Sequence, residues 1–182
     1  MYSYLNFQEI TANWINPDKN IYADLKKLHI WRIKTANFFS ELNSFKLLLE
    51  AAEIESWILI AISNNQIGID LEQINASFTY QNLLDFSFNL DEKNYIQTSA
   101  FPHQSFYKLW TRKEALLKAT GKGLIDELAL IPSLNGNHQN PTQLTSSAES
   151  WQINSFKVDE NHIASTAFIP VKTALQFFNF QL

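Results

Sequence analysis

Cysteine is absent from the 182 residues of the chain. Disulfide bonds and thiolate chemistry are therefore excluded, and a reducing compartment such as the cytoplasm is expected. Positive charge is not in excess either, because the formal net charge is -4 and the sequence pI is about 5.5. Proteins that coat nucleic acid are usually strongly basic, so we expect no nucleic-acid partner and only a small, locally held polyanion.

Long hydrophobic runs are missing as well. The longest apolar run, Trp57–Ile62, is far too short to cross a bilayer. The N-terminus shows no basic cluster followed by an apolar segment, so we expect neither a secretion signal nor a membrane partner. Hydrophobic residues still make up 46% of the chain, which is enough to build the core of one ordinary domain.

Glycine is scarce, and three of the four glycines lie beside charged motifs. Gly68 falls inside a predicted strand, where glycine often marks a close approach to the backbone. Gly121 and Gly123 end a long predicted helix that begins at Pro102. The segment Gly121–Gly123 is not a phosphate-binding P-loop, because its glycines close a helix instead of opening one.

Hydrophobic spacing predicts the remaining elements. The predicted strands are Leu28–Ile33, Trp57–Ser63, Gln66–Glu72, Trp151–Val158, Ile163–Ile169 and an edge strand at Ala174–Phe180. The predicted helices besides the one from Pro102 are Ala36–Ala52, Tyr80–Phe88 and Asp91–Thr98, the last capped by Asp91. Asn64-Asn65 predicts a tight hairpin between Trp57–Ser63 and Gln66–Glu72, and the polar segment Pro132–Ser150 predicts a loop.

Two carboxylates alternate along the strand that contains Gly68. Residues two apart in a strand share a face, so Asp70 and Glu72 should point together. In the predicted hairpin that face also carries Trp57 and Leu59, where two like charges repel unless a cation lies between them. A solvated sheet face is the alternative interpretation of the same pattern.

The helix from Pro102 concentrates positive charge in an acidic protein. Five of the 14 lysines and arginines lie in it or just after it: Lys108, Arg112, Lys113, Lys118 and Lys122. Lys113 falls within the apolar stripe of the helix, where it either extends its ammonium to the surface or meets an anion in a cleft. Glu114 and Lys118 are four residues apart, so they either form a helix-stabilising ion pair or take part in a site.

Together these residues suit a metal ion that holds a phosphate ester. Mg²⁺ prefers oxygen ligands and keeps positions for water and substrate phosphate. The carboxylates of Asp70, Glu72 and Glu114 would supply three ligands. Lys113 and Lys118 could then neutralise charge on the phosphate oxygens during phosphoryl transfer.

The two motifs resemble those of a known family. Gly68–Glu72, followed by Trp110–Lys118 and Gly121–Leu124, is similar to the 4'-phosphopantetheinyl transferase superfamily, in its larger, surfactin-synthetase-activating type. The resemblance is strong from Trp57 to Leu124. It is weaker at Leu28–Ile33, which contains a Trp-Arg pair, and over Trp151–Ile169.

The resemblance implies an α+β fold in which antiparallel sheet strands pack on a long helix. It also implies two similar lobes within a single domain at residues 1–182, with a reduced N-terminal lobe at 1–56 and the motifs in a C-terminal lobe at 57–182. Such enzymes use Mg²⁺ and coenzyme A to place the phosphopantetheine arm on a serine of an acyl or peptidyl carrier protein, and they release 3',5'-ADP. The resemblance thus implies a cytoplasmic holo-acyl-carrier-protein synthase.

The family's site residues carry over to matching positions. By this resemblance Asp70, Glu72 and Glu114 bind the metal, and Glu114 and Lys118 are catalytic. Glu114 would help to deprotonate the attacking serine, directly or through water. Lys113, Lys118 and Lys122 would bind coenzyme A through its diphosphate.

Two departures from the family pattern leave alternatives open. Glu50–Ser56 contains no histidine, although the family usually has a Ser-His-Ser-like stretch there that touches coenzyme A. The N-terminal lobe also lacks the arginine-rich helix that grips the 3'-phosphate, for which the candidates are Lys26, Lys27, Arg32 and Lys34. An inactive relative that binds a carrier protein or coenzyme A is therefore the second hypothesis, and a metal-dependent nuclease is the third.

Overall fold

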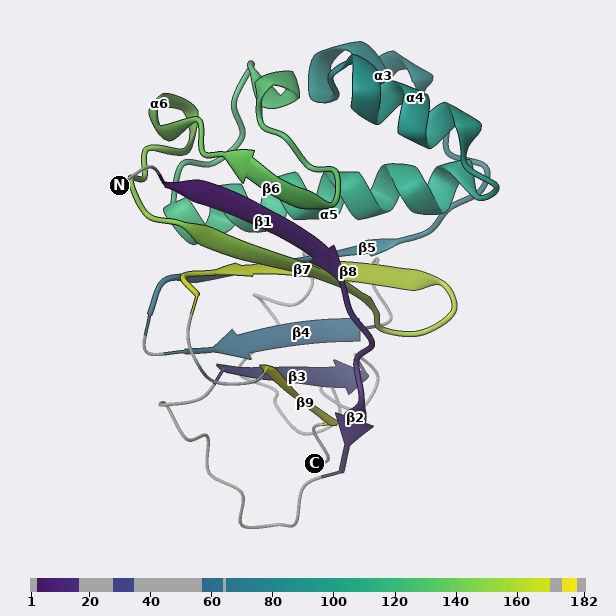
Figure 1. The fold of residues 1–182 in the computed structure, drawn as a ribbon. Coiled ribbons are helices and arrows are strands. Elements are labelled where there is room, and N and C mark those ends of the chain that lie inside the picture. The colour runs from purple at the N-terminus through teal and green to yellow at the C-terminus, as the bar shows by residue number, and fades with distance from the viewer. Residues whose placement is uncertain (1–2, 17–27, 35–56, 64, 171–174, 180–182) are drawn as a thin grey trace, which may run out of the picture. The chain divides into compact units, whose positions relative to one another are not determined.

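The computed structural model describes residues 3–16, 28–34, 57–63, 65–170 and 175–179 (Figure 1). The chain divides into two compact units. Unit 1 comprises Met1–Thr11 and Asn65–Val171, and unit 2 comprises Ala12–Asn64 and Lys172–Leu182. The predicted helix at Ala36–Ala52 lies outside the described residues. The predicted division of one domain at residue 56 stays a prediction.

Unit 1 is built on a five-stranded sheet. Its strands, in spatial order, are β5 (Ile67–Gln73), β8 (His162–Phe168), β7 (Trp151–Lys157), β1 (Tyr4–Glu9) and β6 (Gly136–Gln139). The pairs β5–β8, β7–β8 and β1–β6 are antiparallel, which confirms the predicted pairing of the strands at 151–158 and 163–169. Strands β1 and β7 are parallel, so the sheet is mixed and not wholly antiparallel as predicted.

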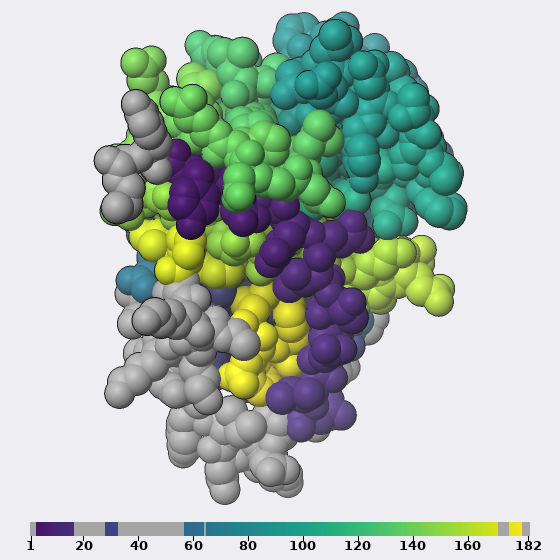
Figure 2. All heavy atoms as spheres, viewed as in Figure 1, coloured from purple at the N-terminus to yellow at the C-terminus, as the bar shows by residue number. Residues whose placement is uncertain are grey.

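Helices cover this sheet in unit 1. They are α3 (Gln81–Ser87), α4 (Leu90–Thr98), α5 (Pro102–Thr120) and α6 (Thr142–Thr145), with a short 3-10 helix, η2 (Leu128–Leu130). Figure 1 shows α5 between the sheet and the pair α3 and α4, in agreement with the contacts of α5 to β5, β8 and α4. Figure 2 shows the teal atoms of α3 and α4 as one closely packed surface. No helix in the described ranges has the length and apolarity needed to cross a bilayer.

The α+β character of the fold follows from the apolar faces of these elements. The core between α5 and the sheet includes Leu5, Phe7, Leu116, Leu117, Trp151 and Ile153, all essentially without exposed surface. The predicted limits of α5 are confirmed, because Pro102 stands in its first turn and Gly121 closes it with a positive φ of 69°. A left-handed residue at this position favours glycine, which has no Cβ to clash.

Unit 2 contains a four-stranded sheet. Its order is β2 (Trp14–Ile15), β9 (Leu175–Asn179), β3 (Leu28–Lys34) and β4 (Trp57–Ile62). The predicted strand at 28–33 is thus confirmed. The prediction that 174–180 is an edge strand is wrong, because β9 lies between β2 and β3. Adjacent residues Phe177 and Phe178 are both buried, which fits a strand covered on both faces.

The predicted hairpin between Trp57–Ser63 and Gln66–Glu72 is also wrong. Strand β4 pairs with β3 in unit 2, whereas β5 pairs with β8 in unit 1. The physical reason lies in β8, whose residues are buried along its whole length and which therefore needs a strand on each side. The turn-forming residues Asn64-Asn65 allow a change of direction, but they do not select the partner strand.

Two local predictions need correction. Helix α4 is capped by Asn89 and not by Asp91. The Asn89 side chain accepts a hydrogen bond from the backbone N–H of Glu92, and the backbone N–H of Asn89 donates one to the Glu92 carboxylate. The predicted loop at Pro132–Ser150 contains β6 and α6. Strand β6 lacks an alternating apolar pattern, and its backbone pairing with β1 is what makes it a strand.

Candidate active site

Gly68 brings the acidic strand against the long helix. A Cβ atom on Gly68 would lie 2.1 Å from the backbone oxygen of Ala115 and 2.4 Å from the backbone nitrogen of Ala119. Only glycine permits this approach of β5 to α5. Asp70 and Glu72 lie on the same face of β5 as Gly68, so they face α5 and not Trp57 and Leu59 as the predicted hairpin required.

Asp70 and Lys118 join the two elements directly. The Nζ atom of Lys118 donates a hydrogen bond of 2.5 Å to Oδ1 of Asp70. The Asp70 side chain is buried, whereas that of Lys118 is 52% exposed. Lys118 therefore pairs with Asp70 across the two elements and not with Glu114 along the helix, which was one of the two predicted interpretations.

Glu114 lies one helical turn before Lys118, and the carboxylate of Asp70 affects its pKa. Burial raises the pKa of Glu114, the negative charge of Asp70 raises it further, and Lys118 opposes both effects. Burial likewise raises the pKa of Asp70, against the opposing effect of Lys118. Two carboxylates and one ammonium therefore form a mutually coupled group, which we call the carboxylate cluster.

The carboxylate cluster has unused acceptors that suit a hard cation. Oδ2 of Asp70 and Oε1 of Glu114 are buried and have no hydrogen-bond partner among the described residues. A buried anionic oxygen without a partner is costly, and a divalent cation with oxygen ligands would satisfy both. The residues present therefore fit Mg²⁺.

Glu72 completes the predicted ligand set only in part. It is half-buried and shares a face of β5 with Asp70. In the part of the chain that the structure describes, no three acidic or histidine side chains are grouped closely enough to hold a metal ion. The structure thus brings together Asp70, Glu114 and Lys118, and the role of Glu72 stays a prediction.

Lys113 does not lie in an open cleft, and its ammonium does not reach solvent. Its side chain has no exposed surface. Its Nζ atom donates to the backbone oxygen of Ser87 at 2.6 Å, to Oε2 of Glu92 at 2.8 Å and to the backbone oxygen of Leu128 at 3.1 Å. Burial lowers the pKa of Lys113 to about 8, against the opposing effect of Glu92. All three ammonium protons therefore have acceptors inside unit 1.

Glu92 is the residue that the sequence analysis missed. It is completely buried, pairs with Lys113 and accepts a 2.6 Å hydrogen bond from Oγ of Ser133. The pattern Asn89-x-x-Glu92 before a helix is a capping-box signal, so the sequence contained a means of locating it. Nothing in that signal indicates the long-range partner, Lys113.

Arg112 and Lys122 differ sharply in their surroundings. Arg112 is completely buried and donates to Oγ of Ser155, the backbone oxygen of Ser133 and Oδ1 of Asn135, each at 2.7 Å. Lys122 is exposed just beyond the end of α5. Among the five cations in α5 or just after it, Lys118 and Lys122 are therefore the ones with substantial access to solvent.

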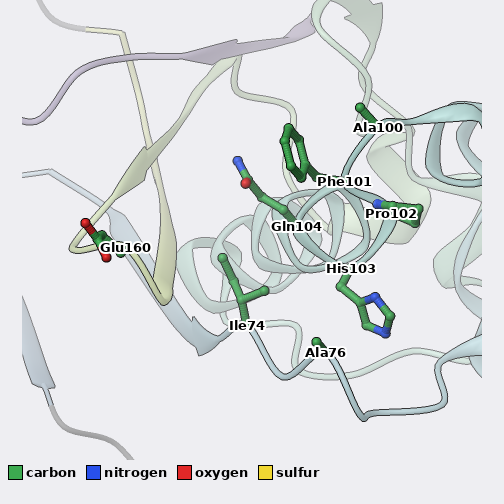
Figure 3. Close-up of a pocket in the computed structure, with 8 residues that line it drawn as sticks. All are labelled: Ile74, Ala76, Ala100, Phe101, Pro102, His103, Gln104 and Glu160. Atoms are coloured by element: carbon green, nitrogen blue, oxygen red, sulfur yellow. The ribbon is translucent and has the colours of Figure 1, made fainter.

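A cavity of about 290 Å³ opens at the opposite end of α5 (Figure 3). Residues after β5, the segment from Ala100 to Gln104, and Glu160 line it. Figure 3 shows the rings of Phe101 and His103 pointing in different directions from the start of the helix. The lining includes an acidic residue and no lysine or arginine, so the cavity does not suit a diphosphate.

Comparison with known proteins points to one family. A sequence model of the 4'-phosphopantetheinyl transferase superfamily matches residues 66–167. The 4'-phosphopantetheinyl transferase gsp of Aneurinibacillus migulanus is 34% identical over 82 residues, which is 44% of this chain and 34% of that protein. The 4'-phosphopantetheinyl transferase HetI of a Nostoc species is 30% identical over 128 residues, which is 66% of this chain and 51% of that protein. The chain thus spans about a third to a half of the length of these relatives.

Proposed function

Because the chain belongs to the 4'-phosphopantetheinyl transferase superfamily, we propose that it transfers the 4'-phosphopantetheine arm of coenzyme A to a serine of an acyl or peptidyl carrier protein. The proposed reaction depends on Mg²⁺ and releases 3',5'-ADP. The matched region, residues 66–167, includes both β5 and α5 and therefore the whole carboxylate cluster.

The proposed reaction is a phosphoryl transfer with a balanced set of bonds. The serine oxygen of the carrier protein bonds to the phosphorus that bears the pantetheine. The bond from that phosphorus to the bridging oxygen of the diphosphate breaks, and 3',5'-ADP leaves with the electron pair. The serine proton passes to a base, for which the cluster offers a carboxylate.

We assign the roles of the residues from their surroundings. Asp70, Glu72 and Glu114 would hold Mg²⁺, which when bound would neutralise charge on the diphosphate. Glu114 accepts the serine proton directly or through water. The half-exposed ammonium of Lys118 is free to turn from Asp70 toward phosphate oxygens, and exposed Lys122 meets the more distant part of the substrate.

Lys113 receives a different role in this proposal. All of its ammonium protons are donated to acceptors within the protein, so we do not propose the predicted contact between Lys113 and the diphosphate. The observation that supports the proposal most strongly is the pair of buried, unpartnered oxygens on Asp70 and Glu114 beside a solvent-accessible lysine. That arrangement costs free energy unless a cation occupies it.

A transfer assay tests this proposal. The full chain is incubated with coenzyme A, Mg²⁺ and a panel of apo carrier proteins, and the mass of each carrier is measured. We expect one carrier to gain the mass of phosphopantetheine, and we expect Asp70→Ala and Glu114→Ala to abolish the gain. Asp126→Ala, which removes an exposed carboxylate outside the cluster, should retain activity. A panel left unmodified, alongside an active control enzyme, would refute the proposal.

A second candidate is an inactive relative that binds a carrier protein or coenzyme A. The observation in its favour is the segment Glu50–Ser56, which has no histidine where the family usually has one. In that case Asp70→Ala and Glu114→Ala would leave the affinity for the partner nearly unchanged. Calorimetric titration with coenzyme A, with and without Mg²⁺, separates the two candidates, because the transferase requires binding that depends on the metal.

Three further features belong to the proposal. They are the two similar lobes with a reduced N-terminal one, the single domain at residues 1–182 and the cytoplasmic location. The candidates for the 3'-phosphate also belong here, although Lys26 and Lys27 lie outside the described residues. Arg32 packs its guanidinium between the rings of Trp14 and Trp57, at 4.3 and 4.8 Å from their centroids, and donates to Oδ1 of Asn179.

A further inference from the structure

The ion pair between Glu92 and Lys113 joins four elements of unit 1. Glu92 comes from the first turn of α4, and Lys113 comes from the middle of α5. Lys113 also binds the backbone at the end of α3, through Ser87, and at η2, through Leu128. Both charged side chains are completely buried.

The pair is not explained well by stability alone. A buried ion pair costs so much desolvation that apolar residues of similar shape often stabilise a fold equally well. Burial indeed lowers the pKa of Lys113, so the ammonium is held at a cost. Five hydrogen bonds hold the pair: Glu92 accepts one from the backbone N–H of Asn89 and one from Ser133, and Lys113 donates three. Beyond the attraction itself, these bonds give the pair a defined orientation.

The ion pair between Glu92 and Lys113 fixes the orientation of Glu114. Lys113 and Glu114 are consecutive, so their side chains leave α5 about 100° apart around its axis. The contact of Gly68 with Ala115 and Ala119 sets how closely α5 approaches β5. Anchoring Lys113 on the α4 side then sets the rotation of the helix and hence the direction in which Glu114 points.

We propose that Glu92 and Lys113 are positioning residues, whose buried pair holds Glu114 toward Asp70 in the geometry that a divalent cation requires. This inference rests on the proposed metal site and therefore on the proposed function. In this proposal Lys113 acts by fixing the rotation of α5. Glu92 supports the site by holding Lys113, and it does not touch the substrate.

A double variant tests the proposal. Glu92→Gln keeps the reciprocal cap with Asn89, since glutamine serves in a capping box, and Lys113→Met keeps most of the buried stem. The full chain with both substitutions should fold, because both buried charges are removed together. Binding of Mn²⁺ and Mg²⁺, measured by calorimetry without substrates, should weaken roughly tenfold, at the lower end of the 10- to 100-fold losses seen when residues that orient ligands are changed.

Two matched variants serve as controls. Lys93→Met removes the 2.7 Å surface ion pair between Lys93 of α4 and Asp85 of α3, and it should leave metal affinity within about twofold of wild type. Asp70→Asn should abolish metal binding. In the transfer assay the double variant should lose kcat while the KM for coenzyme A changes little. The rate is divided by the folded fraction measured by circular dichroism, because a loss of folded protein alone would lower the apparent kcat at unchanged KM.

Each outcome of the metal-binding and transfer experiments supports or overturns one of the two proposals. A folded double variant that binds metal as wild type does would overturn the positioning role, even if wild type is an active transferase. Wild type that binds metal but modifies no carrier would end the proposed function and leave the positioning role standing. Wild type that binds no divalent metal would refute both.

If the double variant does not fold, Ser133→Ala replaces it. This change removes one hydrogen bond to Glu92 and leaves both charges in place. We expect it to weaken metal binding about threefold, less than the double variant does, because one hydrogen bond to Glu92 is lost while the ion pair remains. Unchanged metal affinity in a folded Ser133→Ala protein would count against the positioning role.

Discussion

At the scale of single residues, the carboxylate cluster destabilises the metal-free protein. Asp70 and Glu114 each bury an oxygen that has no hydrogen-bond partner within the described part of the chain, and the two carboxylates repel each other. Lys118 compensates only in part, because burial remains the largest influence on the pKa of Asp70. Such a site lowers the stability of the protein without its cation and raises affinity for the cation.

We therefore predict that Asp70→Asn and Glu114→Gln stabilise the metal-free protein. At neutral pH each should raise the free energy of unfolding by roughly 0.5–2 kcal/mol, as substitutions at strained functional sites often do. Urea unfolding in the presence of a chelator measures this difference. A metal-free Asp70→Asn protein less stable than wild type would contradict the prediction.

The same two carboxyls predict a pH dependence. Their pKa values are higher in the folded than in the unfolded protein, so the folded state binds more protons between the two values. The free energy of unfolding of metal-free wild type should therefore fall as the pH rises from the ordinary carboxyl range through the raised pKa values. The Asp70→Asn/Glu114→Gln variant should lack this fall when unfolding is followed across the same pH range.

At the scale of elements, the contact between β5 and α5 depends on one missing side chain. Gly68→Ala would place a Cβ atom within 2.4 Å of two backbone atoms of α5, which cannot move aside as a flexible side chain can. We predict a loss of at least about 2–3 kcal/mol, at the upper end of the range for overpacked cores. The control is Gly121→Ala, where φ is 69° and no atom lies within 4 Å of the new Cβ. That change should cost only about 1 kcal/mol in the same unfolding experiment.

The start of α4 gives a second test at this scale. Asn89→Ala removes the side-chain half of the capping box and should lower the free energy of unfolding by about 1 kcal/mol. Asp91→Ala, within the first turn, should cost only a few tenths of a kcal/mol through the helix dipole. Thermal unfolding of the two variants compares them directly, and an equal loss would contradict the assignment of Asn89 as the cap.

At the scale of the whole molecule, a bound cation should change stability by mass action. At a Mg²⁺ concentration 100 times its Kd, the free energy of unfolding of wild type should rise by about 2.7 kcal/mol. The rise should vanish in Asp70→Asn and persist in Asp126→Ala. Thermal unfolding over a range of Mg²⁺ concentrations measures it, and a wild-type midpoint that does not respond to Mg²⁺ would contradict the metal site.

The place of β1 predicts how the chain responds to truncation. Strand β1 lies inside the sheet of unit 1, between β7 and β6, and its residues Leu5 and Phe7 are buried. A fragment of residues 57–182 contains the motifs but lacks this strand, so we expect it to unfold without cooperativity. Circular dichroism of the fragment during heating tests this, and a sharp cooperative transition would contradict it.

The sequence predicted the features that depend on neighbouring residues and missed those that depend on residues far apart in the chain. The limits of α5 and the shared strand face of Asp70 and Glu72 follow from local rules, and so they could be predicted. The partner of β5, the strand at β6 and the burial of Lys113 against Glu92 depend on residues far along the chain. Periodicity carries no information about such partners, because many strands present equivalent edges.

The parallel pairing of β1 with β7 sets an order of assembly. Leu5 lies opposite Trp151, so during synthesis β1 must wait for β7, which lies far later in the chain. Closing so long a loop is slow, because chain entropy is lost before any stabilising contact forms. Until β6 and β7 have been made, the nascent chain therefore carries β1 with both edges unpaired, and such an edge can pair with a strand of another chain.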